Sequence, residues 1–265
     1  MELTNIHPGA KLGKSVVIEP FTTIAEHVEI GEGTWIGPNV TIMDYVKIGK
    51  NCKVFPGAVI GAIPQDLKFQ GEVTYVEIGD NTTLREYVTV NRGTVASGKN
   101  LTKVGSNCLL MSYVHIAHDC RVSDNVVISS FAGLAGEVDV YEHAIIGGSS
   151  GVHQFTRIGA HSMISGGSMF SKDVPPYALA GRRPLVFGGV NIIGLRRRGF
   201  SNETITEISD IYKVIYQSGL NTTDACSKVK DDFPQTPERE IILEFILSSK
   251  RGIIRSVTDT TNDDE

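Results

Sequence analysis

The sequence predicts a solenoid of short β-strands and turns over most of the chain, followed by a small helical region. Three observations predict this class. A branched aliphatic residue recurs at every sixth position from Ile6 to Ile60 without interruption. The residue four places after each of them is nearly always small. The chain also has 28 glycines and one tryptophan, which suits tight turns better than a helical bundle.

The six-residue period continues far beyond Ile60. It returns for three positions starting at Ile78 and then runs from Val104 to Ile164, which gives 24 aliphatic positions in all. The residue four places later is Ala, Val, Thr, Ser or Cys in 23 of these 24 repeats, and Pro64 is the exception. This period fits neither the helical 3.6 nor the alternation of a single strand. It fits stacked turns in which a large and a small side chain both point inward.

This pattern resembles the hexapeptide-repeat proteins. The resemblance implies a left-handed parallel β-helix of triangular cross-section, in which three hexads complete one coil of 18 residues. The 24 repeats then give about eight coils or slightly more, stacked at roughly the spacing of strands in a sheet. An all-β fold of this kind is therefore expected for the first part of the chain.

Two stretches interrupt the period, and the chain changes character near its end. We expect the β-helix to span residues 1–188, with loop insertions at about 62–76 and 91–103. Insertions in solenoids are usually exposed on one face, which is often the binding face. We expect a helical domain at 189–257 and a disordered acidic tail at 258–265.

Local signals define the C-terminal elements. The prolines of DVPPYALAGRRP (173–184) should prevent further regular coils. Ser and Thr are good helix N-caps, Pro suits the first helical position and Gly the end. The expected helices are Ser201 to Gln217, Thr222 or Thr223 to Asp232, and Thr236–Pro237 to about Lys250.

Composition limits the possible partners. The net charge of −5 disfavours binding to nucleic acid or anionic lipid. We expect no secretory signal at the N-terminus and no stable membrane insertion, because no apolar run approaches about 20 residues. A cytoplasmic location follows as the expectation. Cys52, Cys108 and Cys120 occupy the small inward position of the repeat and are expected to fill the core.

The segment VHIAHDC (114–120) carries the strongest candidate for chemistry. His118 and Asp119 follow Ile116 by two and three residues, so both should project from an edge of the coil. Adding one coil to His118 gives Gly136, and adding two gives Gln154. An imidazole beside a carboxylate can act as a general base, and a glycine N–H can approach an oxyanion. This column suits acyl transfer.

A zinc site is the alternative chemistry at these histidines. Some hexapeptide-repeat proteins, such as γ-class carbonic anhydrases, bind zinc through three histidines between subunits, and His115, His118, His143 and His153 are available here. The residues two coils from His118 are Gln154 and Thr82, which are poor zinc ligands. We therefore expect no metal and no cofactor.

Longer motifs narrow the resemblance to one family. They cover essentially the whole chain: QDLKF (65–69), RGT (92–94), LTKVG (101–105), LLM (109–111), HIAHDC (115–120), AIIGG (144–148), VHQF (152–155), DVPPY (173–177) and GVNIIGLRRRGF (189–200). These motifs resemble the UDP-N-acetylglucosamine 3-O-acyltransferases, which start lipid A biosynthesis. The resemblance implies a cytoplasmic homotrimer that moves a 3-hydroxyacyl chain from acyl carrier protein to the 3-hydroxyl of UDP-N-acetylglucosamine, in clefts between subunits.

The resemblance also assigns roles to individual residues. His118 matches the general base, Asp119 the carboxylate that orients it, and Gly136 the backbone donor to the oxyanion. The other matches are substrate-binding: Gln65, Asp66 and Lys68 in the first loop; His115, His153 and Gln154 along the cleft; Met163 and Gly166 along the acyl groove; Asn191, Arg197 and Arg198 at the nucleotide.

A basic cluster and three single positions carry further expectations. Arg182, Arg183 and Arg196–Arg198 form a dense basic cluster that suits a pyrophosphate or an acidic carrier protein. A glycine at the family's acyl-length position, here Gly166, implies a chain of about fourteen carbons or more. Glu137 stands where the family commonly has His, and we expect it to bind substrate by accepting a hydrogen bond from a sugar hydroxyl. Ile193 stands where the family often has an acidic residue. Glu137 should stack one coil above Asp119, and two carboxylates that close should raise the pKa of one of them or turn apart.

Two alternatives to this function remain open from the sequence. The first is the later N-acyltransferase of the same pathway, which shares the repeat and the histidine base. The second is a trimeric scaffold without catalytic activity, which would use the basic cluster to bind partners. The QDLK loop and the GLRRRGF motif favour the O-acyltransferase.

Overall fold

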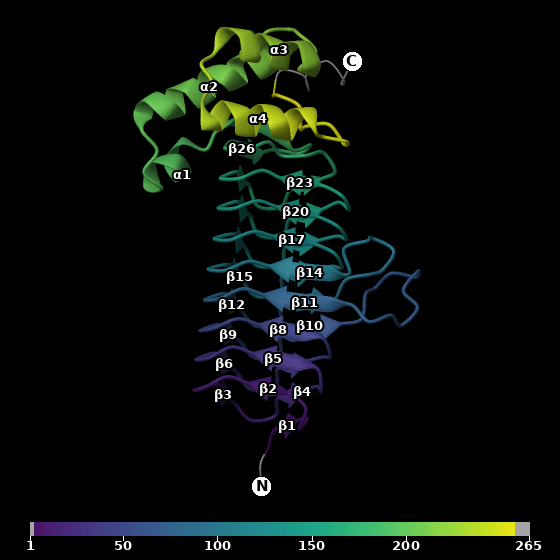
Figure 1. Cartoon of the computed structure of the whole chain (residues 1–265). Coiled ribbons are helices and arrows are strands. Elements are labelled where there is room, and N and C mark those ends of the chain that lie inside the picture. The colour runs from purple at the N-terminus through teal and green to yellow at the C-terminus, as the bar shows by residue number, and fades with distance from the viewer. Residues whose placement is uncertain (1–2, 258–265) are drawn as a thin grey trace.

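The computed structural model describes residues 3–257. The predicted tail at 258–265 lies outside these residues. The chain winds into a column of parallel strands with helices packed over its C-terminal end, and two loops project from the column near its middle (Figure 1). Three sheets form the faces of the column, which is a parallel β-helix.

From β1 to β25 each sheet collects every third strand of the chain, and sheet C then gains β26 and β27. Sheet A contains β1 (Asn5–Ile6), β4 (Thr23–Ile24), β7 (Thr41–Ile42), β10 (Val59–Ala62), β13 (Thr89–Asn91), β16 (His115–Ile116), β19 (Gly133–Leu134), β22 (Gly151–Val152) and β25 (Met169–Phe170). Sheet B contains β2 (Lys11–Leu12), β5 (Val28–Ile30), β8 (Val46–Ile48), β11 (Tyr75–Ile78), β14 (Leu101–Val104), β17 (Arg121–Val122), β20 (Asp139–Val140) and β23 (Arg157–Ile158). Sheet C contains β3 (Val17–Ile18), β6 (Trp35–Ile36), β9 (Lys53–Val54), β12 (Thr83–Leu84), β15 (Leu109–Leu110), β18 (Val127–Ile128), β21 (Ile145–Ile146), β24 (Met163–Ile164), β26 (Ala178–Gly181) and β27 (Val186–Val190).

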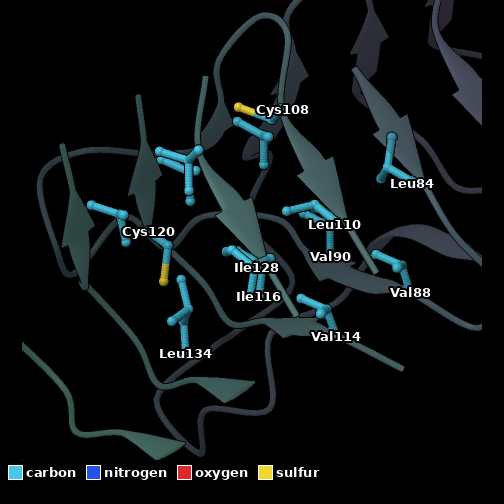
Figure 2. Packing of buried hydrophobic residues seen from close by; sticks show 14 of the residues in the cluster. Leu84, Val88, Val90, Cys108, Leu110, Val114, Ile116, Cys120, Ile128 and Leu134 are labelled. Carbon is cyan, nitrogen blue, oxygen red and sulfur yellow. The ribbon is translucent and has the colours of Figure 1, made fainter. Parts of the chain in front are cut away.

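The aliphatic residue of each hexad fills the inside of the column. Ile116 stacks on Leu134 in sheet A, and Leu110 on Ile128 in sheet C. These side chains are at most 1 % exposed, and Figure 2 shows them converging with Cys120 in the same core. Burying one such side chain contributes roughly 1.5–3 kcal/mol, so the repeat stabilises the fold coil by coil.

The small position of the hexad is buried as well. Cys52, Cys108 and Cys120 are each at most 2 % exposed and unpaired, in agreement with the prediction that they fill the core. Burial raises the pKa of the Cys120 thiol to about 12, which keeps it protonated and unreactive. Cys226, in the helical region, is buried in the same way.

The prediction that the prolines end the regular coils is wrong. After Phe170 the chain makes another turn, and β26 pairs in parallel with β24 before β27 returns antiparallel to it. Pro175 and Pro176 lie in the turn before β26, where no N–H is needed for the ladder. The column therefore gains one more strand layer than the hexad count suggests.

Four helices follow this last layer: α1 (Ile192–Arg197), α2 (Asn202–Gln217), α3 (Thr222–Asp232) and α4 (Pro237–Leu247). Ser201 and Thr236 cap α2 and α4 as predicted, through bonds to the N–H groups of Thr204 and Arg239. α3 runs from Thr222 to Asp232 as predicted, with Asn221 as its N-cap, and α4 ends three residues earlier than expected. Buried residues of α2 and α4 form a second core with Tyr177 of the column.

Candidate active site

The His118–Asp119 pair lies on the turn between β16 and β17. His118 Nδ1 and Asp119 Oδ2 are 2.8 Å apart, and the two side chains are only 12 % and 0 % exposed. Asp119 has a positive φ of 61°, which turns the chain sharply at this corner. The pair therefore has the geometry of a base and the carboxylate that orients it.

The prediction that Asp119 projects from the edge is wrong, because the second insertion covers it. The Thr94 N–H donates to both carboxylate oxygens, at 3.0 and 3.1 Å, and the Thr94 hydroxyl donates to Oδ2 at 2.7 Å. An added Cβ at Gly93 would lie 2.8 Å from Asp119 Oδ1 and closer still to the Leu101 amide nitrogen. Glycine is thus required for the loop to approach the carboxylate this closely.

These contacts set the protonation of the pair. Burial alone would raise the pKa of Asp119, but hydrogen bonds from His118, Ser97 and Thr94 lower it. The ionised carboxylate in turn raises the pKa of His118, chiefly through their hydrogen bond. A neutral His118 donates its Nδ1–H to Asp119, which leaves Nε2 free to accept a proton.

Gly136 lies one coil beyond His118. Ile116 pairs with Leu134, so the residues two places later also stack. An added Cβ at Gly136 would lie 2.5 Å from the imidazole ring of His118, so glycine alone leaves room for the base. Within residues 3–257 no acceptor takes the Gly136 N–H. This amide can serve as an oxyanion donor beside the base.

A groove of about 780 Å³ opens along sheet A at this edge. His118, Gly136 and Gln154 all line it, which confirms the register predicted from the 18-residue coil. The outward positions of β19 and β22 are Gly133 and Gly151. The space above Gly133 is open, whereas the Met169 side chain lies over Gly151, where an added Cβ would be 2.4 Å from its sulfur. The other lining residues include Gln65, Asn91, His115, His153, Met169 and Phe170.

Histidines 115 and 153 flank this groove in different ways. His115 Nδ1 is hydrogen-bonded to the Thr89 hydroxyl at 2.7 Å, and burial lowers the pKa of His115. A neutral imidazole with its other nitrogen unused can contact a substrate. His153 is exposed, and its Nδ1 lies 3.1 Å from the carbonyl oxygen of Gln154.

The first insertion brings a second carboxylate to the base. Asp66 Oδ2 lies 3.9 Å from His118 Nε2, on the side that the substrate hydroxyl would occupy. The Lys68 N–H donates to Asp66 Oδ1 at 2.9 Å and fixes the tip of the loop, while the Lys68 side chain remains exposed. Gln65 is exposed at the mouth of the groove.

Glu137 is half-buried next to the pair. Burial raises its pKa, and Asp119 adds to this effect, whereas Lys99 opposes it. The Lys99 ammonium group donates to the Asp119 carbonyl at 3.2 Å and lies 3.4 Å from Asp139 Oδ1. Of the two stacked carboxyls, Glu137 is therefore the one whose pKa is raised, and burial contributes more to this shift than the charge of Asp119 does.

The remaining predicted site residues lie elsewhere on the chain. Met163 faces outward on sheet C, and Gly166 is exposed on the following turn. Asn191 is buried as the cap of α1, with its side-chain oxygen accepting from Gly194 N–H and its Nδ2 donating to the carbonyl of His161. None of these residues lines the His118 groove.

The two nucleotide-matched arginines differ in their contacts. Arg198 is half-buried and donates to the carbonyl of His143 at 2.9 Å, and burial lowers its pKa. Arg197 is exposed in the last turn of α1. In the part of the chain that the structure describes, no cluster of three or more His, Cys, Asp or Glu side chains is placed to hold a metal ion.

Comparison with known proteins assigns this architecture to a family. A profile described as "Udp N-acetylglucosamine O-acyltransferase; Domain 2" matches residues 173–254, and a bacterial transferase hexapeptide profile matches residues 27–62 and 101–136. An acyl-[acyl-carrier-protein]–UDP-N-acetylglucosamine O-acyltransferase of Sulfurihydrogenibium is 57% identical over 257 residues, which cover 95% of this chain and 94% of the relative. The chain belongs to the UDP-N-acetylglucosamine O-acyltransferase family.

Other members of this family agree over nearly their full length. The Chlorobium phaeobacteroides acyltransferase is 60% identical over 248 residues, or 93% of each chain. The crystal structure of a UDP-N-acetylglucosamine acyltransferase from Bacteroides fragilis superimposes with a TM-score of 0.94 at 52% identity, over 96% of this chain and 99% of that one. The fold is the predicted left-handed parallel β-helix with C-terminal helices. No helix within residues 3–257 has the length and apolar character needed to cross a membrane.

Proposed function

We propose that this chain transfers a 3-hydroxyacyl group from acyl carrier protein to the 3-hydroxyl of UDP-N-acetylglucosamine, the first step of lipid A biosynthesis, in the cytoplasm. The names of its relatives support the reaction. The observation that carries the proposal is the His118–Asp119 pair, whose buried carboxylate orients an imidazole toward an open groove. The later N-acyltransferase remains the alternative that the experiment below must separate.

The geometry supports a direct transfer. His118 Nε2 removes the proton of the sugar hydroxyl as its oxygen attacks the thioester carbonyl. The Gly136 N–H, next to the imidazole, stabilises the oxyanion that forms. The imidazolium then returns its proton to the leaving thiolate, and the C–S bond breaks. Asp119 stabilises the positive charge of the imidazolium between these two proton transfers.

The proposal includes a homotrimer, because one chain does not gather all the proposed residues. Sheet C carries an outward ladder of apolar side chains that stack in register, and these are Leu109, Val127, Ile145, Met163 and Leu179. The groove along sheet A has glycine at two outward positions. An apolar ladder from a second copy placed against this open face would close an acyl channel.

Three further assignments belong to the same proposal. In the trimer, Asn191, Arg197 and Arg198 of a second copy bind the nucleotide, and the arginines suit its pyrophosphate. Gly166 of the second copy, on the turn after β24, leaves room for an acyl chain of about fourteen carbons or more, since a side chain there would narrow the proposed acyl channel. We also propose that residues 1–188 form the β-helical domain, with loops at about 62–76 and 91–103, and residues 189–257 the helical domain.

The decisive experiment offers the purified chain a matched set of substrates. UDP-N-acetylglucosamine and its free-amine counterpart acylated at the 3-hydroxyl are each incubated with 3-hydroxyacyl carrier proteins of ten to sixteen carbons, and products are identified by mass spectrometry. We expect an ester on UDP-N-acetylglucosamine, formed fastest with the longer chains. An amide product would instead support the N-acyltransferase. No product, and no thermal stabilisation by either nucleotide, would favour the scaffold.

A further inference from the structure

The environment of Asp119 raises a physical problem. Its side chain is 0 % exposed, yet its pKa is lowered, so the carboxylate is ionised within the protein. An isolated buried charge is costly unless hydrogen-bond donors replace water. His118 donates its Nδ1–H to this carboxylate, and Thr94 donates both an N–H and a hydroxyl. Thr94 therefore contributes more bonds to this carboxylate than any other residue described here.

The Thr94 hydroxyl has a different hydrogen-bond partner from other threonines at the same position of the hexad. Thr94 stands four residues after Val90, which is the small inward slot of the hexad. At the same slot of other coils, Thr34 donates its hydroxyl to the carbonyl of Gly49, and Thr82 to the carbonyl of Gly105. The Thr94 hydroxyl donates instead to Asp119 Oδ2, the oxygen that also receives His118 Nδ1–H.

The second insertion places Thr94 where it can do this. The Ser97 N–H lies 3.3 Å from the Thr94 hydroxyl, and the Ser97 hydroxyl donates to the Thr94 carbonyl at 2.9 Å. Thr94 is 2 % exposed, although it belongs to a loop. The loop thus covers the carboxylate, with Thr94 held in place by Ser97.

We infer that Thr94 is a positioning residue for the acyl transfer proposed above, which holds Asp119 in one orientation and shares its negative charge. Because Oδ2 accepts a hydrogen bond from the Thr94 hydroxyl, its negative charge interacts less strongly with the imidazole of His118. His118 consequently remains a base that releases its proton again to the leaving thiolate, rather than a permanently protonated ion partner of Asp119.

The experiment compares Thr94→Val with Thr94→Ser and with the matched control Thr82→Val. Valine keeps the shape and the backbone N–H of Thr94 but removes the hydroxyl. We expect Thr94→Val to lower kcat about 10–100-fold, because a hydrogen bond to a charged group is lost, with little change in KM for UDP-N-acetylglucosamine. Thr94→Ser should restore most of kcat. Thr82→Val loses a buried hydrogen bond to Gly105, which does not involve the pair, and should lower Tm but not kcat.

A second readout separates positioning from mere stabilisation. The groups facing His118 are Asp66 of the first loop, Asp119 on its own turn and Glu137 of the next coil, with Lys99 near the carboxylates. Without the Thr94 hydroxyl, the Asp119 carboxylate interacts more strongly with the imidazole, and the pKa of His118 should rise. The acid limb of kcat/KM should therefore move to higher pH in Thr94→Val and return in Thr94→Ser.

The same titration can be followed by NMR of the His118 imidazole in the folded protein without substrate. This measurement reports on Thr94 even if the chain uses another acyl acceptor, so the inference and the proposed function can fail separately. A His118 titration that is the same in Thr94→Val and in the unmodified chain would overturn the inference. A Thr94→Ser variant with a kcat as low as that of Thr94→Val would also overturn it. The same holds for a Thr94→Val variant in which Tm is lowered and kcat is unchanged.

Discussion

His27–Asp44 and His118–Asp119 are His–Asp pairs on turns at the same edge between sheets A and B, but they differ in their distance and in their exposure to water. His27 Nδ1 lies 3.1 Å from Asp44 Oδ1, on turns near the N-terminal end, with 52 % and 42 % of the side chains exposed. The His118–Asp119 pair is 2.8 Å apart and 12 % and 0 % exposed. The first is open to water, and the second lies beneath the two insertions.

The difference shows what the insertions contribute. An exposed ion pair is screened and contributes little, so His27 and Asp44 behave as surface residues beside the Tyr45 ring. Around His118, the loops exclude water and supply donors to the carboxylate, so the same chemical groups become a base. A regular coil provides the edge positions, and the departures from the repeat provide the chemistry.

The largest expected effect removes the base. His118→Ala should reduce turnover about 1,000-fold, because a general base contributes roughly that much to proton transfer. His27→Ala should leave turnover unchanged. Both are measured as the initial rate of acyl transfer from 3-hydroxyacyl carrier protein, after circular dichroism and gel filtration have confirmed the fold and the assembly. Near-normal turnover in a folded His118→Ala protein would remove His118 from the mechanism.

The next effect removes the charge that orients the base. Asp119→Asn should lower kcat about 100-fold, because an amide cannot accept from His118 and both Thr94 donors while stabilising an imidazolium. Asp44→Asn is the matched change in the exposed pair, and its rate should stay that of the unmodified chain. Equal losses in the two variants would mean that burial of the carboxylate has no catalytic importance.

A smaller effect concerns the space beside the imidazole. In Gly136→Ala the new Cβ would lie 2.5 Å from the His118 ring, so the ring must shift and kcat should fall about 10-fold. The matched change is Gly133→Ala, where a Cβ meets nothing within 4 Å, and it should leave the His118 imidazole resonances in place. NMR spectra of the imidazole distinguish the two. Unshifted resonances in Gly136→Ala would contradict the close packing.

Much of this architecture could be predicted because the repeat is periodic. The hexads give the core, the three faces and the stacking of His118 on Gly136 and Gln154. The position of a loop cannot be derived from that period, because where the loop packs against the column depends on long-range contacts such as those of Thr94. For this reason the burial of Asp119 was missed. The only local signal was Thr94 at the small inward slot, inside a segment that otherwise leaves the repeat.

The C-terminal region shows the same limit. The caps of α2 and α4 depend on a few adjacent residues and were predicted correctly. The strand β26 was missed because prolines stop a strand only where their missing N–H would be needed, and Pro175 and Pro176 fall in a turn. The sequence likewise could not show that Asn191 caps α1, because both of its hydrogen-bond partners depend on the folded chain.

The smallest effect is a shift in pH dependence. The Asp119 hydrogen bond, followed by the charges of Asp66 and Glu137, raises the pKa of His118 above its ordinary 6.5. A base acts when deprotonated, so kcat/KM should fall as the pH drops through this raised value. The stability linked to His118 has the opposite sign: it is present below 6.5 and is lost as the pH rises through the folded pKa.

Glu137→Gln tests the weakest of these contributions. Without this carboxylate the pKa of His118 should fall, and the acid limb of kcat/KM should move to lower pH while the plateau changes little. Asp44→Asn removes a carboxylate from the exposed pair and should leave the limb in place. A limb that does not move in Glu137→Gln would show that solvent screens Glu137 from the imidazole, and the protected environment would then extend only over Asp119 and the loop that covers it.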